Sequence, residues 1–449
     1  MFYNYLPSTK LTNSKGISSA LFPKNKTNST EKELNITSTG ITSVEGIAHF
    51  KQYHPIGKST THRLLVYGND KKVYINQMLD DTWDLFWLYN LEFESAPIIL
   101  NFKKEDTDAI ILACDNSMKI WQTGYSPYTI SGVPIITSMC MNDGVLFCTI
   151  QEPAHKIWYA TDLNPVNIGN ISNYSGFISL EDNLGDARKV ITFDEGVYVF
   201  RDYGITKISK YQTTHSSSQI YLSNTKIYTD TVSVCGNNIL FMTKEGLYCF
   251  NGVKVCKTGV ELLNSLPVDN AGAVASSLGE KYYLALRMDF KDGKQILCEG
   301  ECVNNVLIVI DTSDFSYEII RGVDIKSMLP VKTEVFEKML VTFNNGPIDK
   351  IGEVDETSKV MDEILPKFWS CGSIVDGVNT KLFTKLSIVA DSGVTFSLKY
   401  DGKTTNFTTY KSGINEFMFK ICCKDMEIEI SSLNASAVVE KVLLEYYEY

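Results

Sequence analysis

From about residue 44 onward, the chain repeats one pattern of apolar and polar positions. Each repeat has an apolar run, a turn that carries Gly, Asn, Asp or Glu, and a second run in which apolar and polar residues alternate. The clearest copies lie at 63–75, 190–200 and 239–250, with turns at Asn69-Asp70, Glu195-Gly196 and Glu245-Gly246. Alternation with a period of two indicates strands, and a short turn between two such runs predicts a β-hairpin.

Looser copies of this pattern occupy 109–121, 144–160, 306–320 and 339–351. The positions of successive repeats are marked by one residue each: Tyr74, Ile120, Trp158, Tyr198, Tyr248, Val309 and Lys350. These markers recur about every 40 to 60 residues, which is the length of a four-stranded propeller blade. Helical repeats are disfavoured, because turn residues interrupt the runs about every 8 to 12 positions. Residues 44–356 are therefore predicted to form a β-propeller of about six or seven blades.

A different spacing begins near Pro366 and predicts a second domain at 366–449. Its alternating runs are shorter and closer together, at 381–390, 394–400, 416–422, 426–430 and 437–446. Turns at Asp391-Ser392-Gly393 and Asp401-Gly402 separate some of them, a pattern typical of a small antiparallel β-sandwich. The predicted fold class is thus all-β.

Residues 1–43 differ from both domains. Most of this segment is rich in Ser, Thr, Asn and Lys and has almost no apolar periodicity, so it is not expected to fold alone. We expect an extended N-terminal arm. It is either a disordered tail or a segment that orders on a neighbouring subunit in an assembly.

Composition and charge narrow the class of protein. The 449 residues include 53 acidic and 42 basic side chains, and the net charge of −11 argues against a protein that holds nucleic acid through phosphate contacts. No run of about 18 apolar residues could span a membrane, and the first residues lack the charged-then-apolar order of a signal peptide. We therefore expect synthesis in a cytoplasm and no membrane partner.

Metal and cofactor sites are not expected. Most of the 11 cysteines lie in apolar, strand-like runs, which favours buried free thiols over disulfides. Cys298 with Cys302, and Cys422 with Cys423, lack the paired spacing of a zinc site. His49, His54 and His62 have a spacing that suits neither a helix face nor one side of a strand, so surface or turn positions are predicted for them.

No arrangement of catalytic residues is found, and the chain is predicted not to be an enzyme. The segment 55–60 ends like a phosphate-binding loop, but the loop requires Gly at position 52, where this chain has Gln52. A propeller glycosidase would need an arginine cluster and paired carboxylates. Asp80 and Asp81 are the nearest candidates and are interpreted as a solvated turn.

One aromatic stretch is a candidate binding surface. Trp83, Phe86, Trp87 and Tyr89 lie close together and could contact a partner subunit or stack on the rings of a glycan. Packing inside a blade is the competing interpretation, and it is the one that the composition of an ordinary blade favours.

The order of features resembles a known family. The features that carry the resemblance are the arm, the segment at 156–165, the hairpins at 196–208 and 233–252, and the final sandwich. The chain is similar in this order to the propeller-type tail hub and packaged-DNA stabilisation proteins, or head-to-tail connectors, of tailed bacteriophages. The resemblance is one of pattern over most of the chain.

This resemblance implies a structural virion protein, assembled in the host cytoplasm. It would be one subunit of a ring or hub at the neck or tail, bound to copies of itself and to other phage neck and tail proteins. The ring would link to or close the DNA exit channel, and phage DNA would pass through it only transiently. Two alternatives stay open: a receptor- or glycan-binding virion component, and a cytoplasmic propeller that serves as an interaction scaffold.

Overall fold

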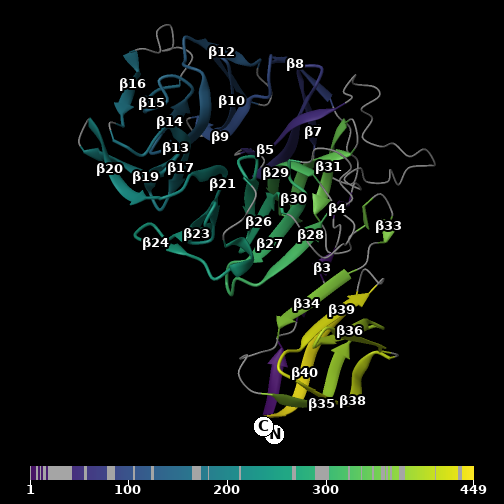
Figure 1. Cartoon of the computed structure of the whole chain (residues 1–449). Helices are drawn as coiled ribbons and strands as arrows, with labels where there is room; N and C mark the ends of the chain where they lie inside the picture. Colours follow the sequence, from purple (N-terminus) through teal and green to yellow (C-terminus); the bar gives the residue numbers. More distant parts are fainter. Residues whose placement is uncertain are drawn as a thin grey trace, which may run out of the picture.

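The structure is a computed structural model of the whole chain (Figure 1). It describes residues 2–6, 9–10, 12–13, 17–18, 43–54, 58–77, 86–104, 107–122, 126–163, 173–180, 182–211, 214–264, 269–288, 303–321, 324–334, 336–345, 348–354, 359–360, 363–364, 367–373, 380–409, 411–432 and 437–448. Within these ranges the chain is built from β-strands, with one short 3₁₀ turn, η3 (Glu261–Leu263).

Seven four-stranded antiparallel sheets form the blades of a β-propeller. The strands of blades 1 to 3, in chain order, are β5 (Val44–His54), β6 (Ser59–Gly68), β7 (Lys72–Gln77), β8 (Phe86–Glu92), then β9 (Ile98–Lys104), β10 (Thr107–Cys114), β11 (Ser117–Trp121), β12 (Tyr128–Ser131), then β13 (Ile136–Asn142), β14 (Val145–Ile150), β15 (Lys156–Ala160) and β16 (Ser175–Ser179).

Blades 4 to 6 repeat this order. Their strands are β17 (Ala187–Phe193), β18 (Gly196–Arg201), β19 (Gly204–Tyr211), β20 (Thr214–Leu222), then β21 (Ile227–Cys235), β22 (Asn238–Thr243), β23 (Gly246–Phe250), β24 (Val255–Lys257), then β25 (Val274–Leu278), β26 (Lys281–Leu286), β27 (Val306–Asp311) and β28 (Tyr317–Arg321).

Blade 7 is completed by a strand from the start of the chain. Its first three strands are β29 (Asp324–Lys332), β30 (Glu337–Asn345) and β31 (Ile348–Val354). The fourth is β4 (Ile17–Ser18), which pairs antiparallel with β31 through Glu353 opposite Ser18 and Val354 opposite Ile17. The propeller ring therefore includes a strand that lies before blade 1 in the sequence.

The second strand of each blade is buried on both faces, because neighbouring blades cover it from both sides. All six residues of β14 and of β18 are buried, and these strands read as continuous apolar runs with few polar positions. Burial on both faces favours such runs over alternation. The outer strands are more exposed, as β12 and β16 show, and they alternate accordingly.

Each pair of neighbouring blades shares a cluster of buried apolar side chains. One such cluster lies between blades 1 and 2, and others follow between each successive pair up to blades 6 and 7. A further cluster joins blade 7 to blade 1. Apolar burial therefore continues around the whole ring, as expected for a propeller that closes on itself.

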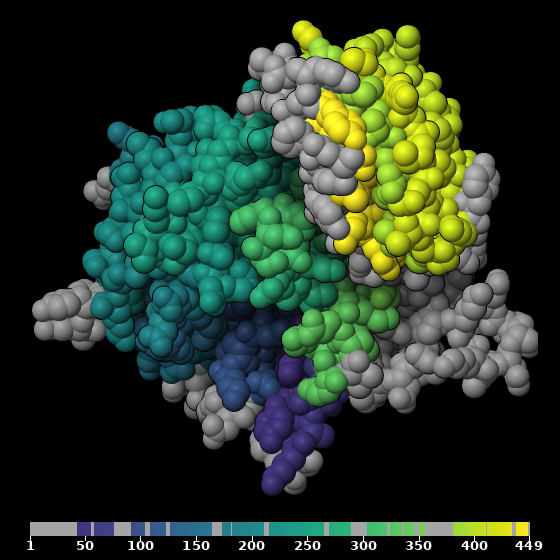
Figure 2. Space-filling model, turned by 90° about the horizontal axis from the view of Figure 1, so that it is seen from below, coloured from purple at the N-terminus to yellow at the C-terminus, as the bar shows by residue number. Residues whose placement is uncertain are grey.

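The second domain is a two-sheet sandwich with its own core. One sheet has the order β1 (Phe2–Leu6), β40 (Val438–Glu448), β35 (Lys381–Ala390) and β38 (Gly413–Cys423), with β2 (Thr9–Lys10) also pairing with β40. The other has the order β3 (Thr12–Asn13), β34 (Lys367–Ser373), β39 (Glu427–Ser432), β36 (Thr395–Tyr400) and β37 (Lys403–Thr408). Figure 2 shows the sandwich in yellow beside the green blades, and β3 contacts β28 of blade 6.

The described parts of the N-terminal segment pair within the chain itself. β1 and β2 extend one sheet of the sandwich, β3 extends the other, and β4 completes blade 7. These four strands are extended and pair within this chain, whereas an extended arm over all of residues 1–43, and its ordering on a neighbouring subunit, stay predictions. Strand addition through main-chain hydrogen bonds needs no apolar periodicity, so a polar sequence is compatible with it.

The sequence markers divide correctly among the blades. Each of the seven lies in a different blade, and all but Tyr198 lie in a third strand. Tyr198 lies in β18, a second strand. The sequence of 357–365 is typical of a short helical turn. In the structure this segment contains the paired strands β32 (Lys359–Val360) and β33 (Glu363–Ile364).

Candidate functional site

The junction between blades 7 and 1 has the smallest apolar cluster of the ring. Among the described residues it contains seven buried side chains: Val44, Leu64, Val66, Tyr74, Val331, Leu340 and Ile351. The cluster between blades 2 and 3 contains sixteen. Because apolar burial is the main stabilising term between blades, polar contacts at this junction add to a small apolar cluster.

A carboxylate and two imidazoles supply such contacts. His62 on β6 is 3% exposed, and its Nε2 lies 2.7 Å from Oε2 of Glu334 in the turn between β29 and β30. The Nζ of Lys51 on β5 lies 3.8 Å from the other oxygen of the same carboxylate. Glu334 therefore joins blade 7 to two strands of blade 1.

The other nitrogen of His62 is bonded to His49. Nε2 of His49 lies 3.0 Å from Nδ1 of His62, and the two rings are within 8° of parallel. Since the carboxylate of Glu334 can only accept, Nε2–H of His62 donates a hydrogen bond to it, and with this tautomer Nδ1 of His62 accepts a hydrogen bond from Nε2–H of His49. Burial, His62 and Lys51 lower the pKa of His49 to about 4. His49 is therefore neutral near pH 7, and the three residues form a continuous chain of hydrogen bonds.

The prediction of surface or turn positions for these histidines is wrong for His49 and His62. Both lie on strands, and the hairpin β5–β6 brings them together although their linear spacing suits neither a helix nor one strand. His54 lies at the end of β5 and bonds the hydroxyl of Thr61 at 2.9 Å. The missed signal was the hairpin register, since antiparallel strands bring residues on two strands face to face.

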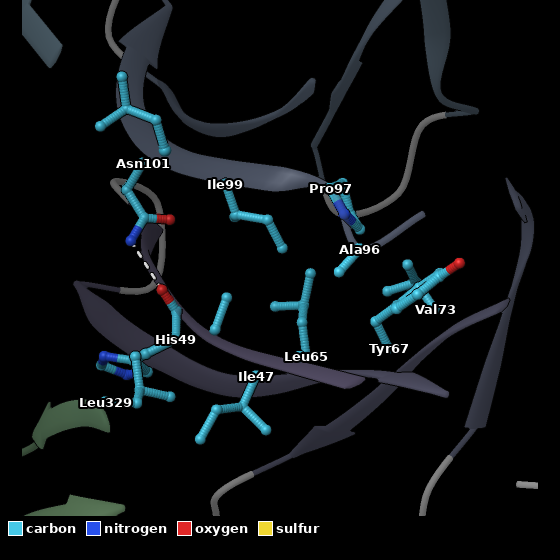
Figure 3. Close-up of a pocket in the computed structure, with 13 residues that line it drawn as sticks. Ile47, His49, Leu65, Tyr67, Val73, Ala96, Pro97, Ile99, Asn101 and Leu329 are labelled. Atoms are coloured by element: carbon cyan, nitrogen blue, oxygen red, sulfur yellow. Dashed lines mark hydrogen bonds between the residues drawn. The ribbon is translucent and has the colours of Figure 1, made fainter. Parts of the chain in front are cut away.

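A cavity lies beside His49, at the inner ends of blades 1 and 2 (Figure 3). Its volume is about 390 Å³, and most of the side chains that line it are apolar. The lining comes from β5, β6, β7, β9 and the loop before β9, with Leu329 from blade 7. We call this cavity the inner recess. The side-chain amide of Asn101 lines the recess, and Nδ2 of Asn101 donates a hydrogen bond to the carbonyl of His49 at 2.7 Å.

The chemistry available in the inner recess is that of binding. Its lining holds no Ser, Cys, Thr, Asp, Glu, Lys or Arg, so His49 has no nucleophile or carboxylate beside it there. Across the described residues there is no group of three or more His, Cys, Asp or Glu side chains that could hold a metal ion. A mostly apolar recess whose polar side chains are His49, Asn101 and Tyr67 suits an apolar side chain or small apolar ligand.

The aromatic stretch from the sequence lies partly outside the described residues. Trp83 is outside them, whereas Phe86, Trp87 and Tyr89 belong to β8, the outer strand of blade 1. The β7–β8 register places Trp87 opposite Tyr74 and Phe86 opposite Ile75. The stretch and the inner recess thus lie on outer and inner strands of the same blade. For these aromatic side chains, contact with a partner and packing inside the blade both stay predictions.

Cys114, Cys140, Cys148, Cys235, Cys249, Cys256, Cys422 and Cys423 are free thiols. Five of them are buried, at Cys114, Cys140, Cys148, Cys235 and Cys423. Burial raises the pKa of Cys140 to about 12 and that of Cys423 to about 11, which keeps both thiols protonated and unreactive near neutral pH. Cys256 and Cys422 are exposed. The described part of the chain contains no helix that is long and apolar enough to cross a membrane.

Comparison with known proteins does not assign the chain to a family. No protein-family model and no curated protein sequence matches the chain. Among solved structures, it is similar to Hsv2 of Kluyveromyces lactis, with 10% sequence identity and a TM-score of 0.33, over 58% of this chain and 81% of that one. It is also similar to BBS1N in complex with ARL6DN, with 10% identity and a TM-score of 0.42, over 67% of this chain and 89% of that one. These similarities concern the fold alone.

Proposed function

We propose that this β-propeller is an interaction scaffold without catalytic activity, and that the inner recess receives an apolar side chain of a protein partner. The observation that carries the proposal is the recess itself. It is an apolar cavity with Asn101 and His49 at its edge and with no nucleophile or carboxylate in its lining. Such a surface offers burial and orientation to a ligand and offers no group that could react with it.

The strands around the inner recess support this use. Ile98, Ile99 and Leu100 on β9 are only partly buried, although they form three successive apolar positions on the innermost strand of blade 2. Ile47 on β5 and Leu329 on β29 are also partly buried and lie near them. A recess of about 390 Å³ is at the small end of the range of about 300 to 1,000 Å³ for ligand sites. It therefore fits one or two side chains better than a large cofactor.

A display experiment tests the proposal with the full chain. Random peptides on yeast are selected for binding to the wild-type protein and then measured individually against two variants. Ala96→Trp fills the recess from an exposed position, so its cost to folding is small. Ala271→Trp, at an exposed position before β25, is the matched control.

We expect selected peptides with an aromatic or aliphatic anchor that bind the wild type and Ala271→Trp equally. Their binding to Ala96→Trp should be at least about tenfold weaker, because the anchor loses its buried position. Equal binding to both variants, or a selection that enriches no peptide, would exclude the inner recess as the docking site.

A finer proposal places the scaffold in a tailed-phage particle, as a ring or hub subunit at the neck or tail. It rests on the resemblance in the order of arm, hairpins and sandwich. The strand pairing of β1 to β4 is compatible with it, because short added strands can be exchanged between identical subunits of a ring. The acidic net charge is compatible with a conduit through which DNA slides.

Cryo-electron microscopy of particles from the source would test this finer proposal. Density for this chain in a symmetric ring at the neck or tail is the expected result. Absence from particles would favour the cytoplasmic scaffold, and density only at a distal tip would favour a receptor-binding or glycan-binding component.

A further inference from the structure

The sandwich has a long edge strand with an exposed apolar face. β38 (Gly413–Cys423) is the last strand on its side of the sheet, and the described strands include none that pairs with its free edge. An edge strand of 11 residues without proline is a template for pairing with another chain. Proteins usually protect such edges with charges, bulges or short strands.

Side chains along β38 alternate between the two faces. The outward positions are Ile414, Glu416, Met418, Lys420 and Cys422, and each of them is exposed. Met418 is 73% exposed and Ile414 is 59% exposed, among the most exposed large apolar residues of the described chain. The strand thus presents two apolar positions that are separated and followed by charges.

The register between β35 and β38 shifts near Thr384, where two residues of β38, Phe419 and Lys420, lie opposite one residue of β35. β35 pairs with β38 through Phe383 opposite Ile421 and Lys385 opposite Met418. Phe383 is buried, whereas Lys385 faces outward, although they are only two positions apart, so the change of face occurs in β35 at Thr384. Between Met418 and Ile421 the alternation of exposed and buried positions is unbroken.

We propose that two copies of this chain pair through their β38 strands, antiparallel, about a two-fold axis at Met418. In this register Met418 lies opposite Met418 of the second copy. Glu416 lies opposite Lys420, and Ile414 lies opposite Cys422, on both sides of the axis. An apolar contact at the centre is therefore flanked by two pairs of opposite charge.

Charge complementarity selects a second copy as the occupant of this edge. A two-fold interface requires that the strand complements itself, because each copy contributes the same residues. Lys420 has no ion pair among the described residues, while Glu416 is held by Lys385 of β35. The exposed Lys420 would gain a carboxylate across the interface, and this carboxylate is already held by Lys385 on its own copy.

The inward face of the same register also matches. Phe417 of one copy lies opposite Phe419 of the other, and both side chains are only partly buried in the single chain. Both already contact Phe407 of β37, with ring centroids 5.6 and 6.4 Å apart. Pairing would therefore extend the aromatic part of the sandwich core from one copy into the next. This inference does not depend on the inner recess.

Sedimentation equilibrium of the full chain over a concentration series tests the interface through its charges. Lys420→Glu places two carboxylates opposite each other at both ends of the pairing, and Glu416→Lys places two ammonium groups there. Each variant should weaken the dimer about tenfold, and the double variant should recover most of that loss. Lys244→Glu, in an exposed turn of blade 5, makes the same change in net charge and should leave the dimer unchanged.

A monomeric wild type at every concentration would overturn the proposal. So would a Lys420→Glu variant whose self-association equals that of Lys244→Glu. Failure of the double variant to recover the dimer would exclude this register, since only here do the two positions oppose each other.

Oxidative crosslinking gives a second, independent readout of the register. Residues directly opposite each other on antiparallel strands have Cβ atoms about 4.5 to 5.5 Å apart, close to the separation in a disulfide. Ile414→Cys should crosslink to the native Cys422 of the second copy, and peptide mapping would identify the pair. In a Cys422→Ser background the same substitution should give no such crosslink, whereas Met418→Cys should crosslink to itself. The absence of both crosslinks would rule out pairing about Met418.

Discussion

The imidazole of His62 in blade 1 lies 2.7 Å from the carboxylate of Glu334 in blade 7, although 272 positions separate the two residues in the chain. This hydrogen bond crosses the junction where the first and last blades meet. The junction has the smallest apolar cluster in the described part of the ring. We therefore expect this polar contact to add to ring closure beside that apolar cluster.

Removing the carboxylate should lower the stability of the protein. Glu334→Gln is expected to reduce the free energy of unfolding by more than the control substitution below, because it weakens a charge-assisted hydrogen bond to a buried imidazole, although the Glu334 side chain is itself 59% exposed. Urea denaturation of the full chain measures this change. A double-mutant cycle with His62→Phe isolates the coupling between the two residues.

Glu337→Gln is the matched control for this experiment. Glu337 pairs with Lys332 at side chains that are 44% and 71% exposed, so its loss should cost less than about 0.5 kcal/mol. Equal costs for the two substitutions would show that the contact between His62 and Glu334 is no stronger than an ordinary surface pair.

The low pKa of His49 predicts a dependence of stability on pH. An unfolded histidine has a pKa near 6.5, whereas burial, His62 and Lys51 lower the pKa of His49 to about 4 in the folded protein. Between these values the unfolded state binds more protons, so stability falls as the pH falls from about 6.5 to about 4. His49 is partly exposed, and we expect its contribution to be about 1 to 3 kcal/mol.

His49→Gln should remove this part of the pH dependence. Unfolding free energies of the wild type and the variant, measured from pH 7.5 to pH 4, should then differ in slope within that window. Parallel curves would show that His49 titrates in the folded protein as it does in the unfolded chain. Carboxylates titrate in both proteins, so the difference between the two curves reports on His49.

Arg201 is expected to be a strongly stabilising residue of blade 4. Its side chain is 1% exposed, pairs with Asp182 and donates to the carbonyl of Gly185. Arg201→Met should lower the free energy of unfolding by about 1 to 3 kcal/mol, because it leaves the partly buried carbonyl of Gly185 without its donor, whereas Asp182 is 34% exposed and can be solvated. Thermal denaturation of the full chain measures the loss.

Arg188→Met gives the comparison for Arg201. Arg188 is 44% exposed, although it pairs with Asp186 and Asp202. Its loss should therefore cost much less than the loss of Arg201. A larger cost for Arg188→Met would show that burial does not determine which arginine of this blade matters more.

The N-terminal strands can be tested by amide hydrogen exchange. Deleting residues 1–18 removes β1 to β4, so β40 and β31 lose their outer neighbours. Amides from Val442 to Tyr446 should then exchange at least about tenfold faster, while those of β22 in blade 5 should be unaffected. Unchanged protection of β40 would mean that β1 is not held there in solution.

The same measurement separates pairing within one chain from exchange between copies. If β1 pairs with its own chain, protection of β40 in the full-length protein is independent of protein concentration. Protection that rises with concentration would instead support an arm that orders on a neighbouring subunit.

Local pattern was sufficient to predict the blades. The turns at Asn69-Asp70, Glu195-Gly196 and Glu245-Gly246 lie at or beside the expected hairpins, between β6 and β7, β17 and β18, and β22 and β23. The first strand of the sandwich that follows the blades in the chain is β34, which begins at Lys367. Hairpins and strand alternation are properties of neighbouring residues, so a single sequence contains them.

The contacts that close the ring could not be predicted in the same way. His62 and Glu334 are adjacent only because the propeller is circular, and β4 reaches blade 7 only after the chain has passed through the sandwich. The inner recess likewise combines Leu329 with His49 from opposite ends of the propeller sequence. Such contacts depend on tertiary closure, for which the apolar pattern of one strand gives no signal.

The N-terminal strands also determine the order in which the protein can be completed during synthesis. Phe2 pairs with Tyr446, and Ile17 pairs with Val354, so each of these strands is synthesised more than 300 residues before its partner. The hairpins of blades 1 to 6 can form as they emerge, because their partners are local. Until β31 and then the C-terminal strands of the sandwich are synthesised, β4 and β1 to β3 have no partner strands, and it is in this interval that chaperone binding or pairing with a neighbouring nascent chain is most favourable.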